Sequence, residues 1–381
     1  MSLALHAIGT ATPPRQITQA DAATLAIDFA NAEPGRERTL AAIYRQTKIR
    51  TRGSVLLDEP GDAAYAQDFF LPATHGDDAG PTTAERMDRY AREAGPLAIR
   101  AARSAVAEAG VAADAVTHLV TCSCTGFANP GVDLQVIAAL GLPATVARTH
   151  VGFMGCHGAF NALRVAHAFT AADPAAVVLV VCVELCSLHF QYGTRSDHVV
   201  ANSIFADGAA AIVATAQTSG AREQWRLLGQ RSQVLPASSD QMGWIIGDHG
   251  FEMTLSPRVP DEIAVHLPAA VDALLRSQGL ERSDVASWAV HPGGPRILAA
   301  VAETLGLADQ SLRHSRGVLA DHGNMSSATI LFILKRLAAE GSPGPCVAMA
   351  FGPGLTAELA LFDANHSRRT APTEGARCNS R

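Results

Sequence analysis

The sequence predicts an α/β fold made of two duplicated halves. Apolar runs of strand length alternate with Ala- and Leu-rich segments of helical period, and this alternation is typical of α/β proteins. The run at residues 177–183 is apolar throughout, which indicates a central strand covered on both faces. The third observation is a repeated order of strand, reactive residue, helix and strand, found once in each half.

The repeat can be followed element by element. In the first half, a strand at 118–122 is followed by Cys156 near the start of a helix and then by a strand at 177–184. In the second half, a strand at 287–290 is followed by Asn324 near the start of a helix and then by a strand at 346–351. The spacing from Cys156 to Glu184 is 28 residues, and so is the spacing from Asn324 to Gly352. One such match can arise by chance because α/β units share similar element lengths. The repeated order favours duplication.

The other elements follow from local patterns. Residues 1–8 predict a first strand, ended by a turn at Gly9-Thr10. The insertion at 59–84 is rich in Asp, Pro and Gly and predicts a surface loop with a short helix. Segments of helical period lie at 97–109, 159–169 and 263–275.

The boundary between the halves is expected where polar residues interrupt two strand-like runs, at 217–226. We therefore expect an N-terminal half at 1–216 that carries the nucleophilic cysteine, and a C-terminal half at 226–363 that carries the histidine and asparagine. The remaining residues, 364–381, are polar and cationic without apolar periodicity, which predicts a disordered tail.

The composition excludes several classes of protein. With 48% hydrophobic and only 17% charged residues, the 381-residue chain can bury a large core and is not predominantly disordered. The net charge of −6 gives no basic field for nucleic acid or an anionic membrane, although a local basic pocket for one phosphorylated ligand stays open. The longest strongly apolar run, 175–183, is far shorter than the roughly 20 residues that span a bilayer.

The cysteines and the N-terminus indicate the compartment. The seven cysteines form no CxxC pair, and their odd number argues against a disulfide framework. The N-terminus lacks the cationic segment of a secretion signal. We therefore expect a reducing, cytoplasmic location.

Cys156 is the strongest candidate nucleophile. It lies in Gly-Phe-Met-Gly-Cys-His-Gly-Ala-Phe at 152–160, just before an apolar-periodic helix. The unpaired N–H groups and the macrodipole at a helix N-terminus favour the thiolate, and the flanking glycines let a substrate approach the backbone. A buried structural thiol is the alternative, because that is the usual state of a free cysteine.

His291 and Asn324 are the candidate partners of this nucleophile. His291 stands at a strand end in His-Pro-Gly-Gly-Pro-Arg, where it can point into a cleft, although a histidine before Pro-Gly is more often a turn residue. Asn324 opens a helix and is either an ordinary N-cap or a hydrogen-bond donor to an enolate oxygen. Together the three residues offer a nucleophile and two oxyanion donors. The His and Cys spacings lack a metal-ligand pattern, so no metal site is expected.

Five motifs occur in a fixed order: Met-Gly-Cys156-His-Gly-Ala, Phe205-Ala-Asp-Gly-Ala-Ala-Ala, His291-Pro-Gly-Gly-Pro, Gly-Asn324-Met-Ser-Ser-Ala and Phe351-Gly-Pro-Gly-Leu-Thr-Ala-Glu358. Together they resemble the type III polyketide synthases, the chalcone synthase family, over about residues 3–363. The resemblance implies the thiolase fold, a five-layered αβαβα arrangement of two duplicated halves, in a homodimer. It also implies an acyltransferase that extends an acyl-CoA starter with malonyl-CoA, with these two substrates and no cofactor.

The resemblance assigns roles to individual positions. Cys156 matches the acylated nucleophile, and His291 and Asn324 match the residues that hold the thioester carbonyl during malonyl decarboxylation. Phe205 matches a gatekeeper between the CoA tunnel and the cavity; without the motif it would be read as a core residue. Gly352 and Pro353 belong to a stretch that resembles the loop shaping the cyclisation cavity, which would otherwise be read as a tight turn.

A basic stretch at 45–52 corresponds to the family's entrance for the CoA phosphates. Lys and Arg suit phosphate binding, and the candidates are Arg45, Lys48, Arg50 and Arg296. A short charge run is usually a solvated face, and that alternative stays open.

Four cavity positions depart from the plant pattern. The second gatekeeper aromatic falls at Met253, Trp244 falls where the plant enzymes have a glycine, and Cys124 and His189 fall where they have threonines. These changes leave the core reaction intact but do not favour the plant product or an aromatic starter. We expect an aliphatic starter in a channel that bypasses Trp244, with an alkylpyrone or alkylresorcinol type of product. A small cavity that accepts only acetyl- or malonyl-sized starters is the alternative.

The sequence thus predicts a type III polyketide synthase that releases a cyclised product. An initiating ketoacyl synthase shares the Cys, His and Asn but stops after one condensation; the motif at 351–358 and the chain length favour the first reading. A non-catalytic homologue is the other alternative, against which the intact Cys156, His291 and Asn324 argue.

Overall fold

The computed structural model describes residues 2–30, 35–59, 66–75, 78–216 and 223–364. The strands of its large sheet are β1 (Leu3–Ala11), β4 (His118–Ser123), β5 (Ala147–Gly152), β6 (Val177–Leu185), β7 (Asp207–Thr215), β8 (Trp225–Val234), β11 (Ser287–Val290), β12 (Cys346–Gly352) and β13 (Thr356–Ala364). They follow the order β11-β12-β13-β8-β1-β7-β6-β4-β5. Two small antiparallel sheets pair β2 (Gln16–Thr18) with β3 (Thr51–Gly53) and β9 (Met242–Gly247) with β10 (Gly250–Leu255).

The helices cover this sheet and fill the space between its two halves. They are α1 (Gln19–Ala30), α2 (Glu37–Gln46), α3 (Thr83–Ala109), α4 (Val132–Leu140), α5 (Gly158–Ala172), α6 (Ser196–Ile204), α7 (Val259–Arg276), α8 (Pro295–Leu305), α9 (Arg313–His322) and α10 (Thr329–Ala339). None of these helices combines the length and the apolar character that a membrane span requires.

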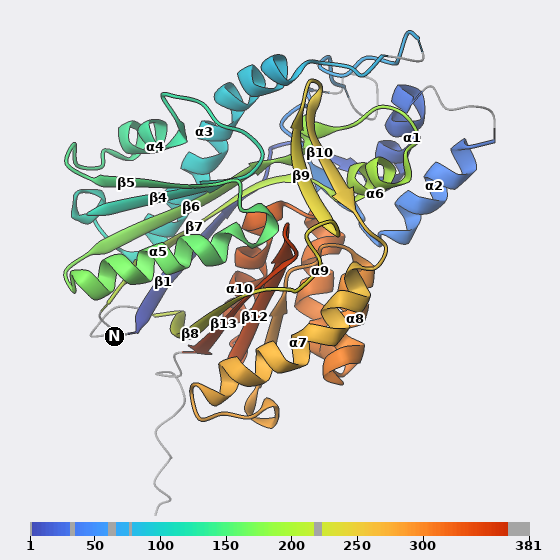
Figure 1. Cartoon of the computed structure of the whole chain (residues 1–381). Helices are drawn as coiled ribbons and strands as arrows, with labels where there is room; N and C mark the ends of the chain where they lie inside the picture. The colour runs from blue at the N-terminus through green and yellow to red at the C-terminus, as the bar shows by residue number, and fades with distance from the viewer. Residues whose placement is uncertain (1, 31–34, 60–65, 76–77, 217–222, 365–381) are drawn as a thin grey trace, which may run out of the picture.

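The main elements stack in five layers (Figure 1). The helices α3 and α4 pack on the outer face of the first-half strands, and α7 and α8 on the outer face of the second-half strands. Between them, α5 and α10 share one core with strands of both halves. This αβαβα arrangement is the fold expected from the sequence.

The strand pairing confirms that the halves are duplicated. In the first half β4 pairs in parallel with β6, and β6 pairs antiparallel with β7. In the second half β11 pairs in parallel with β12, and β12 pairs antiparallel with β13. A short antiparallel pairing of β1 with β8 joins the halves into one sheet. The central strand β6 is buried along almost its whole length, as its continuous apolar character predicts.

The turn expected at Gly9-Thr10 is wrong, because β1 continues through both residues to Ala11. The helix α3 crosses this strand so closely that a Cβ on Gly9 would lie 2.1 Å from the carbonyl oxygen of Ala101. The glycine therefore permits a close approach between helix and strand rather than a turn.

The short helix expected in the insertion is not found at 66–75 or 78–82, which are the described parts of it before α3. The insertion is also not wholly a surface loop, because Phe70 is buried and packs with tilted rings against Phe29 and Phe190. Residues 60–65, 76–77, 217–222 and the tail 365–381 lie outside the described residues, so the disorder expected for the tail stays a prediction.

Candidate active site

Cys156 lies in a 3₁₀ turn, Gly155–His157, that leads directly into α5. The turn needs its glycines. Gly155 has a φ of +76°, and a Cβ there would meet Pro353 at 2.6 Å, while a Cβ on Gly158 would meet the Cys122 sulfur at 2.7 Å. The small flanking residues thus let the nucleophile sit deep at the helix start, with 8% of its surface exposed.

Asn324 lies between α9 and a 3₁₀ turn, Ser326–Ala328, that precedes α10. Its backbone N–H donates to the Ile204 carbonyl at 3.0 Å, and its carbonyl accepts from the Ala206 N–H at 2.9 Å. Its side-chain oxygen accepts the Ser326 N–H at 2.8 Å, two residues further on. Met325 caps the 3₁₀ turn and Ala328 caps α10, so the N-cap reading of Asn324 is wrong. The Asn324 side chain instead lies near Cys156, where it acts to lower the pKa of the thiol.

His291 follows the end of β11, where its N–H donates to the Met349 carbonyl at 2.8 Å. The side chain is almost fully buried, and neither ring nitrogen has a hydrogen-bond partner among the described residues. Burial, assisted by the neighbouring His157, lowers the pKa of His291 to about 3, so the ring is neutral. Because His157 follows Cys156 in sequence, His291 lies beside the turn that carries the nucleophile.

The ionisation expected for Cys156 needs correction. Burial raises the pKa of its thiol to about 11, and the carboxyl of Glu184 acts in the same direction. The neighbouring polar side chains of Ser326 and Asn324 lower the pKa of the thiol but oppose this shift only in part. In the unliganded chain the desolvation at this depth outweighs the effect of the helix N-terminus, so the neutral thiol is favoured over the thiolate.

A small cavity of about 20 Å³, the catalytic cavity, opens at Cys156. Its lining includes the predicted residues Cys124, Phe205, Trp244, Met253 and Pro353, together with Cys186 and Ser326, which the sequence reading did not name. Gly352 does not line it; a Cβ there would meet the His157 ring at 2.4 Å, so this glycine makes room for the histidine next to the nucleophile.

A larger apolar space of about 110 Å³, the chamber, adjoins the catalytic cavity. Four residues line both: Cys186, Phe205, Trp244 and Met253. The rest of the chamber wall is mostly aliphatic and aromatic and includes Ile17, Leu25, Phe29, Leu56, Phe70 and Phe190.

Trp244 and His189 form part of the chamber wall. The Trp244 indole Nε1 donates to the Cys124 carbonyl at 2.7 Å, and Met253 lies opposite it in the β9–β10 hairpin. His189 does not line the catalytic cavity. Its Nε2 hydrogen-bonds to the Thr125 carbonyl at 2.7 Å and its Nδ1 accepts the Phe251 N–H at 2.9 Å, so it ties a loop to the hairpin.

Glu184 is a residue that sequence reasoning did not assign. It is fully buried at the end of β6 and accepts hydrogen bonds from the Cys124 N–H at 3.0 Å, from the Thr125 hydroxyl at 2.8 Å and from the Ser327 hydroxyl. Burial raises its pKa. Its position in the sequence, a charged residue at the end of a continuous apolar strand, could have indicated a buried carboxyl group that needs hydrogen-bond donors.

The four predicted CoA cations do not line either space. Arg45, Lys48, Arg50 and Arg296 are all exposed, and Arg50 already forms an ion pair with Asp321. Arg52 of the same stretch is buried, where its Nη1 donates to the carbonyls of Asn202 at 2.6 Å and Phe205 at 2.8 Å. Within the described residues no group of three or more His, Cys, Asp or Glu side chains is arranged to hold a metal ion.

Comparisons with known proteins identify relatives over almost the whole chain. Residues 2–218 match the model of the N-terminal domain of chalcone and stilbene synthases, and residues 227–364 match the model of their C-terminal domain. The chain is 34% identical to the alpha-pyrone synthesis polyketide synthase-like Pks18 of Mycobacterium tuberculosis, over 94% of this chain and 90% of that protein. It is 33% identical to 1,3,6,8-tetrahydroxynaphthalene synthase of Streptomyces peucetius, over 93% and 92%. Its structure resembles that of a fungal type III polyketide synthase, ORAS, with a TM-score of 0.83 and 29% identity over 96% of this chain and 100% of that one.

Proposed function

The chain belongs to the chalcone and stilbene synthase family of type III polyketide synthases, and on that premise we propose how its residues carry out the condensation of an acyl-CoA starter with malonyl-CoA. The observation that supports the assignment best is the buried Cys156, whose thiol pKa is influenced by Asn324, together with a buried His291 that has two unpartnered ring nitrogens among the described residues. A buried polar ring without a partner is costly, and a substrate oxygen or thiol would satisfy it.

In the loading step the Cys156 sulfur attacks the thioester carbon of the starter. The thiol proton passes to a ring nitrogen of neutral His291, which then gives it to the departing CoA sulfur. The raised pKa of Cys156 makes this transfer necessary, because little thiolate is present beforehand. The product of the step is an acylated Cys156 and free CoA.

In the extension step malonyl-CoA loses CO₂ and leaves an enolate. The side-chain N–H of Asn324 and a ring N–H of His291 donate to the enolate oxygen, which stabilises the charge without a metal. The enolate carbon attacks the carbonyl carbon of the Cys156 thioester, and the C–S bond to Cys156 breaks. The acyl chain is then on the CoA thioester with two more carbons, and Cys156 leaves as a thiolate that takes up a proton from water. Phe205, which lines both the catalytic cavity and the chamber, keeps its proposed role as the gatekeeper between the CoA tunnel and the cavity.

The chamber supports an aliphatic starter. Its wall is mostly apolar and it is larger than the catalytic cavity, so an alkyl chain can lie there while its thioester reaches Cys156. Each buried CH₂ contributes about 0.8 kcal/mol. The name of the mycobacterial relative points to an α-pyrone, and we propose an alkylpyrone or alkylresorcinol type of product for this chain.

The CoA phosphates are assigned to the exposed cations Arg45, Lys48 and Arg50, with Arg296 as a further candidate. Their exposure leaves the guanidinium and ammonium groups accessible, although Arg50 must exchange its Asp321 partner for phosphate.

A homodimer is proposed from the edge of the sheet. The strand β5 is the last of the large sheet, and the residues that follow it, Phe153 and Met154, are 40% and 38% exposed. Phe127, whose ring contacts the same Phe251 ring as Phe153 does, is 57% exposed. An unpaired edge beside exposed apolar side chains is suited to pairing with a second copy. Light scattering should give twice the mass of the chain. The cytoplasmic location stays a prediction.

A panel of acyl-CoAs with malonyl-CoA, analysed by mass spectrometry, tests the proposed function. We expect alkyl starters to give cyclised products with several added two-carbon units. Products with a single added unit would instead support an initiating ketoacyl synthase, and a protein that attaches no acyl group to Cys156 would support a non-catalytic homologue.

A further inference from the structure

The chamber shares a wall with a third space. A polar cleft of about 420 Å³ is lined by Asp78, Asp248, His249 and Glu252, among others. Gln191 and His198 line both this cleft and the apolar chamber. These two side chains therefore separate the chamber from the cleft.

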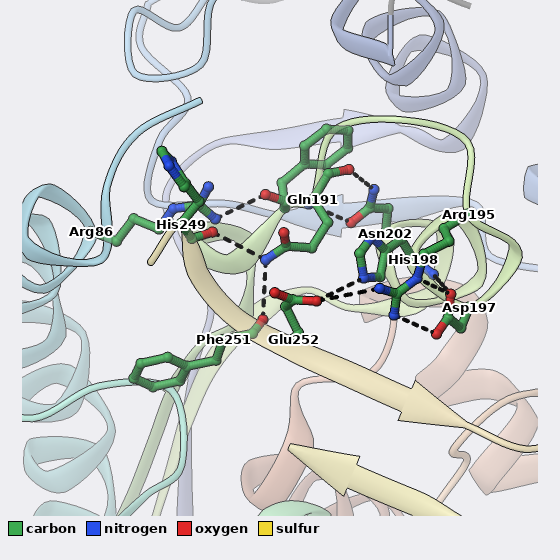
Figure 2. A network of polar contacts seen from close by, with 10 residues as sticks. Arg86, Gln191, Arg195, Asp197, His198, Asn202, His249, Phe251 and Glu252 are labelled. Carbon is green, nitrogen blue, oxygen red and sulfur yellow. Dashed lines mark hydrogen bonds and ion pairs between the residues drawn. The ribbon is translucent and has the colours of Figure 1, made fainter. Parts of the chain in front are cut away.

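Hydrogen bonds and an ion pair hold the wall in place (Figure 2). The Gln191 Nε2 donates to the carbonyls of His249 at 3.2 Å and Phe251 at 3.3 Å. The His198 Nε2 lies 3.3 Å from a Glu252 oxygen, and Arg195 lies 3.6 Å from the same oxygen. Gln191 and His198 are 8% and 7% exposed, so they fill the space between α6 and β10.

The two sides of the wall differ in chemistry. On the chamber side an alkyl chain meets mostly aliphatic and aromatic side chains and gains free energy for each CH₂ that leaves water. On the cleft side it would meet the carboxylates of Asp78, Asp248 and Glu252, which remain favourable only when hydrated. An alkyl chain long enough to reach the wall gains nothing by passing it.

We propose that Gln191 and His198 form a stop that sets the longest alkyl chain the chamber accepts. The proposal rests on the proposed function, because it requires that the starter is aliphatic and lies in the chamber. It assigns a specificity role to two residues that are not among those lining the catalytic cavity.

The test measures the attachment of straight-chain acyl groups of increasing length to Cys156, by mass spectrometry of the intact protein without malonyl-CoA. In the wild type, loading should rise with chain length and then fall at a limit. His198→Ala removes the imidazole from the wall and should move that limit by about two carbons or more, with about a fourfold gain in loading rate for each further CH₂ that becomes buried. Gln191→Ala tests the other half of the wall in the same way.

Two further variants are controls, one for the bulk of the side chain at position 198 and one for the loss of an imidazole elsewhere in the chain. His198→Phe keeps a ring in the wall and should keep the wild-type limit. His266→Ala removes a partly exposed imidazole from α7, outside both spaces, and should also keep it. Thermal unfolding of each variant shows that it is folded.

The two proposals can fail separately. A wild type with a clear length limit that both His198→Ala and Gln191→Ala leave in place would overturn the stop alone, as would an equal change in His266→Ala. If the wild type accepts the acetyl group of acetyl-CoA but no acyl group with a longer alkyl chain, the proposal of an aliphatic starter is itself overturned.

Discussion

Trp244 divides the space in which the starter and the growing chain must lie. It lines both the catalytic cavity of about 20 Å³ and the chamber of about 110 Å³. Its ring is fixed by the 2.7 Å hydrogen bond to the Cys124 carbonyl and by edge-on contacts with His189 and Phe251. Trp244→Gly removes this partition and joins the two spaces.

The stability cost of Trp244→Gly can be estimated from these contacts. Truncating a fully buried Trp costs about 3–5 kcal/mol. Because Trp244 is only partly buried, we expect a loss of about 2–3 kcal/mol in the free energy of unfolding, of which the hydrogen bond contributes about 1 kcal/mol. Urea unfolding measures this loss, and Trp244→Phe, which keeps a ring but lacks the indole N–H, should lose less.

The functional effect depends on where the starter lies. If the chamber already holds an alkyl starter, Trp244→Gly should leave the longest accepted starter nearly unchanged and should add malonyl units to the product, because the growing chain folds near Cys156. Mass spectrometry of the products from one fixed starter counts these units. A variant that accepts longer starters but keeps the wild-type number of extensions would show that the starter does not use the chamber.

Three further results are expected. Asn324→Ala should lower CO₂ release from malonyl-CoA on the order of 10²-fold or more, because one enolate donor is lost, while a wild-type rate would refute its role. At pH values below the Cys156 pKa of about 11, the rate of Cys156 alkylation by iodoacetamide should rise about tenfold for each pH unit, as followed by peptide mapping. A rate that does not change with pH would contradict the neutral thiol. Cys156→Ala should abolish acyl loading. Burial lowers the pKa of His189 to about 3, so the unfolded chain binds a proton below about pH 6.5 that the folded chain does not, and stability falls as the pH falls. Urea unfolding should show that His189 lowers the free energy of unfolding by about 2 kcal/mol between neutral pH and about pH 5, and that His189→Gln reduces this pH dependence. An equal pH dependence in both proteins would show that another group is responsible.

The candidate catalytic residues could be picked out from the sequence because local motifs mark them. The glycines around Cys156 and the Pro-Gly-Gly after His291 report backbone requirements that a single stretch of chain reveals. Trp244 and Met253, by contrast, were expected at the cavity only because the family resemblance assigns them there by position, and both line it.

What the sequence could not predict depends on burial and on contacts between distant segments. The ionisation of Cys156 follows from its depth, which no local pattern gives. His189 was expected at the cavity and does line the chamber, but its two hydrogen bonds to residues about sixty positions away on either side, which also tie a loop to the hairpin, could not be predicted. The wall of Gln191 and His198 exists only because α6 packs against β10.

The pairing between Phe205 and Asn324 joins the gatekeeper to the amide donor across the two halves of the chain. Ile204 and Ala206, on either side of Phe205, accept and donate the backbone hydrogen bonds of Asn324. The backbone at Phe205 therefore cannot shift without pulling on Asn324, the residue proposed to stabilise the enolate. On the proposed roles, substrate admission and decarboxylation are mechanically linked, so substitutions of Phe205 intended to widen the entrance should change kcat together with KM.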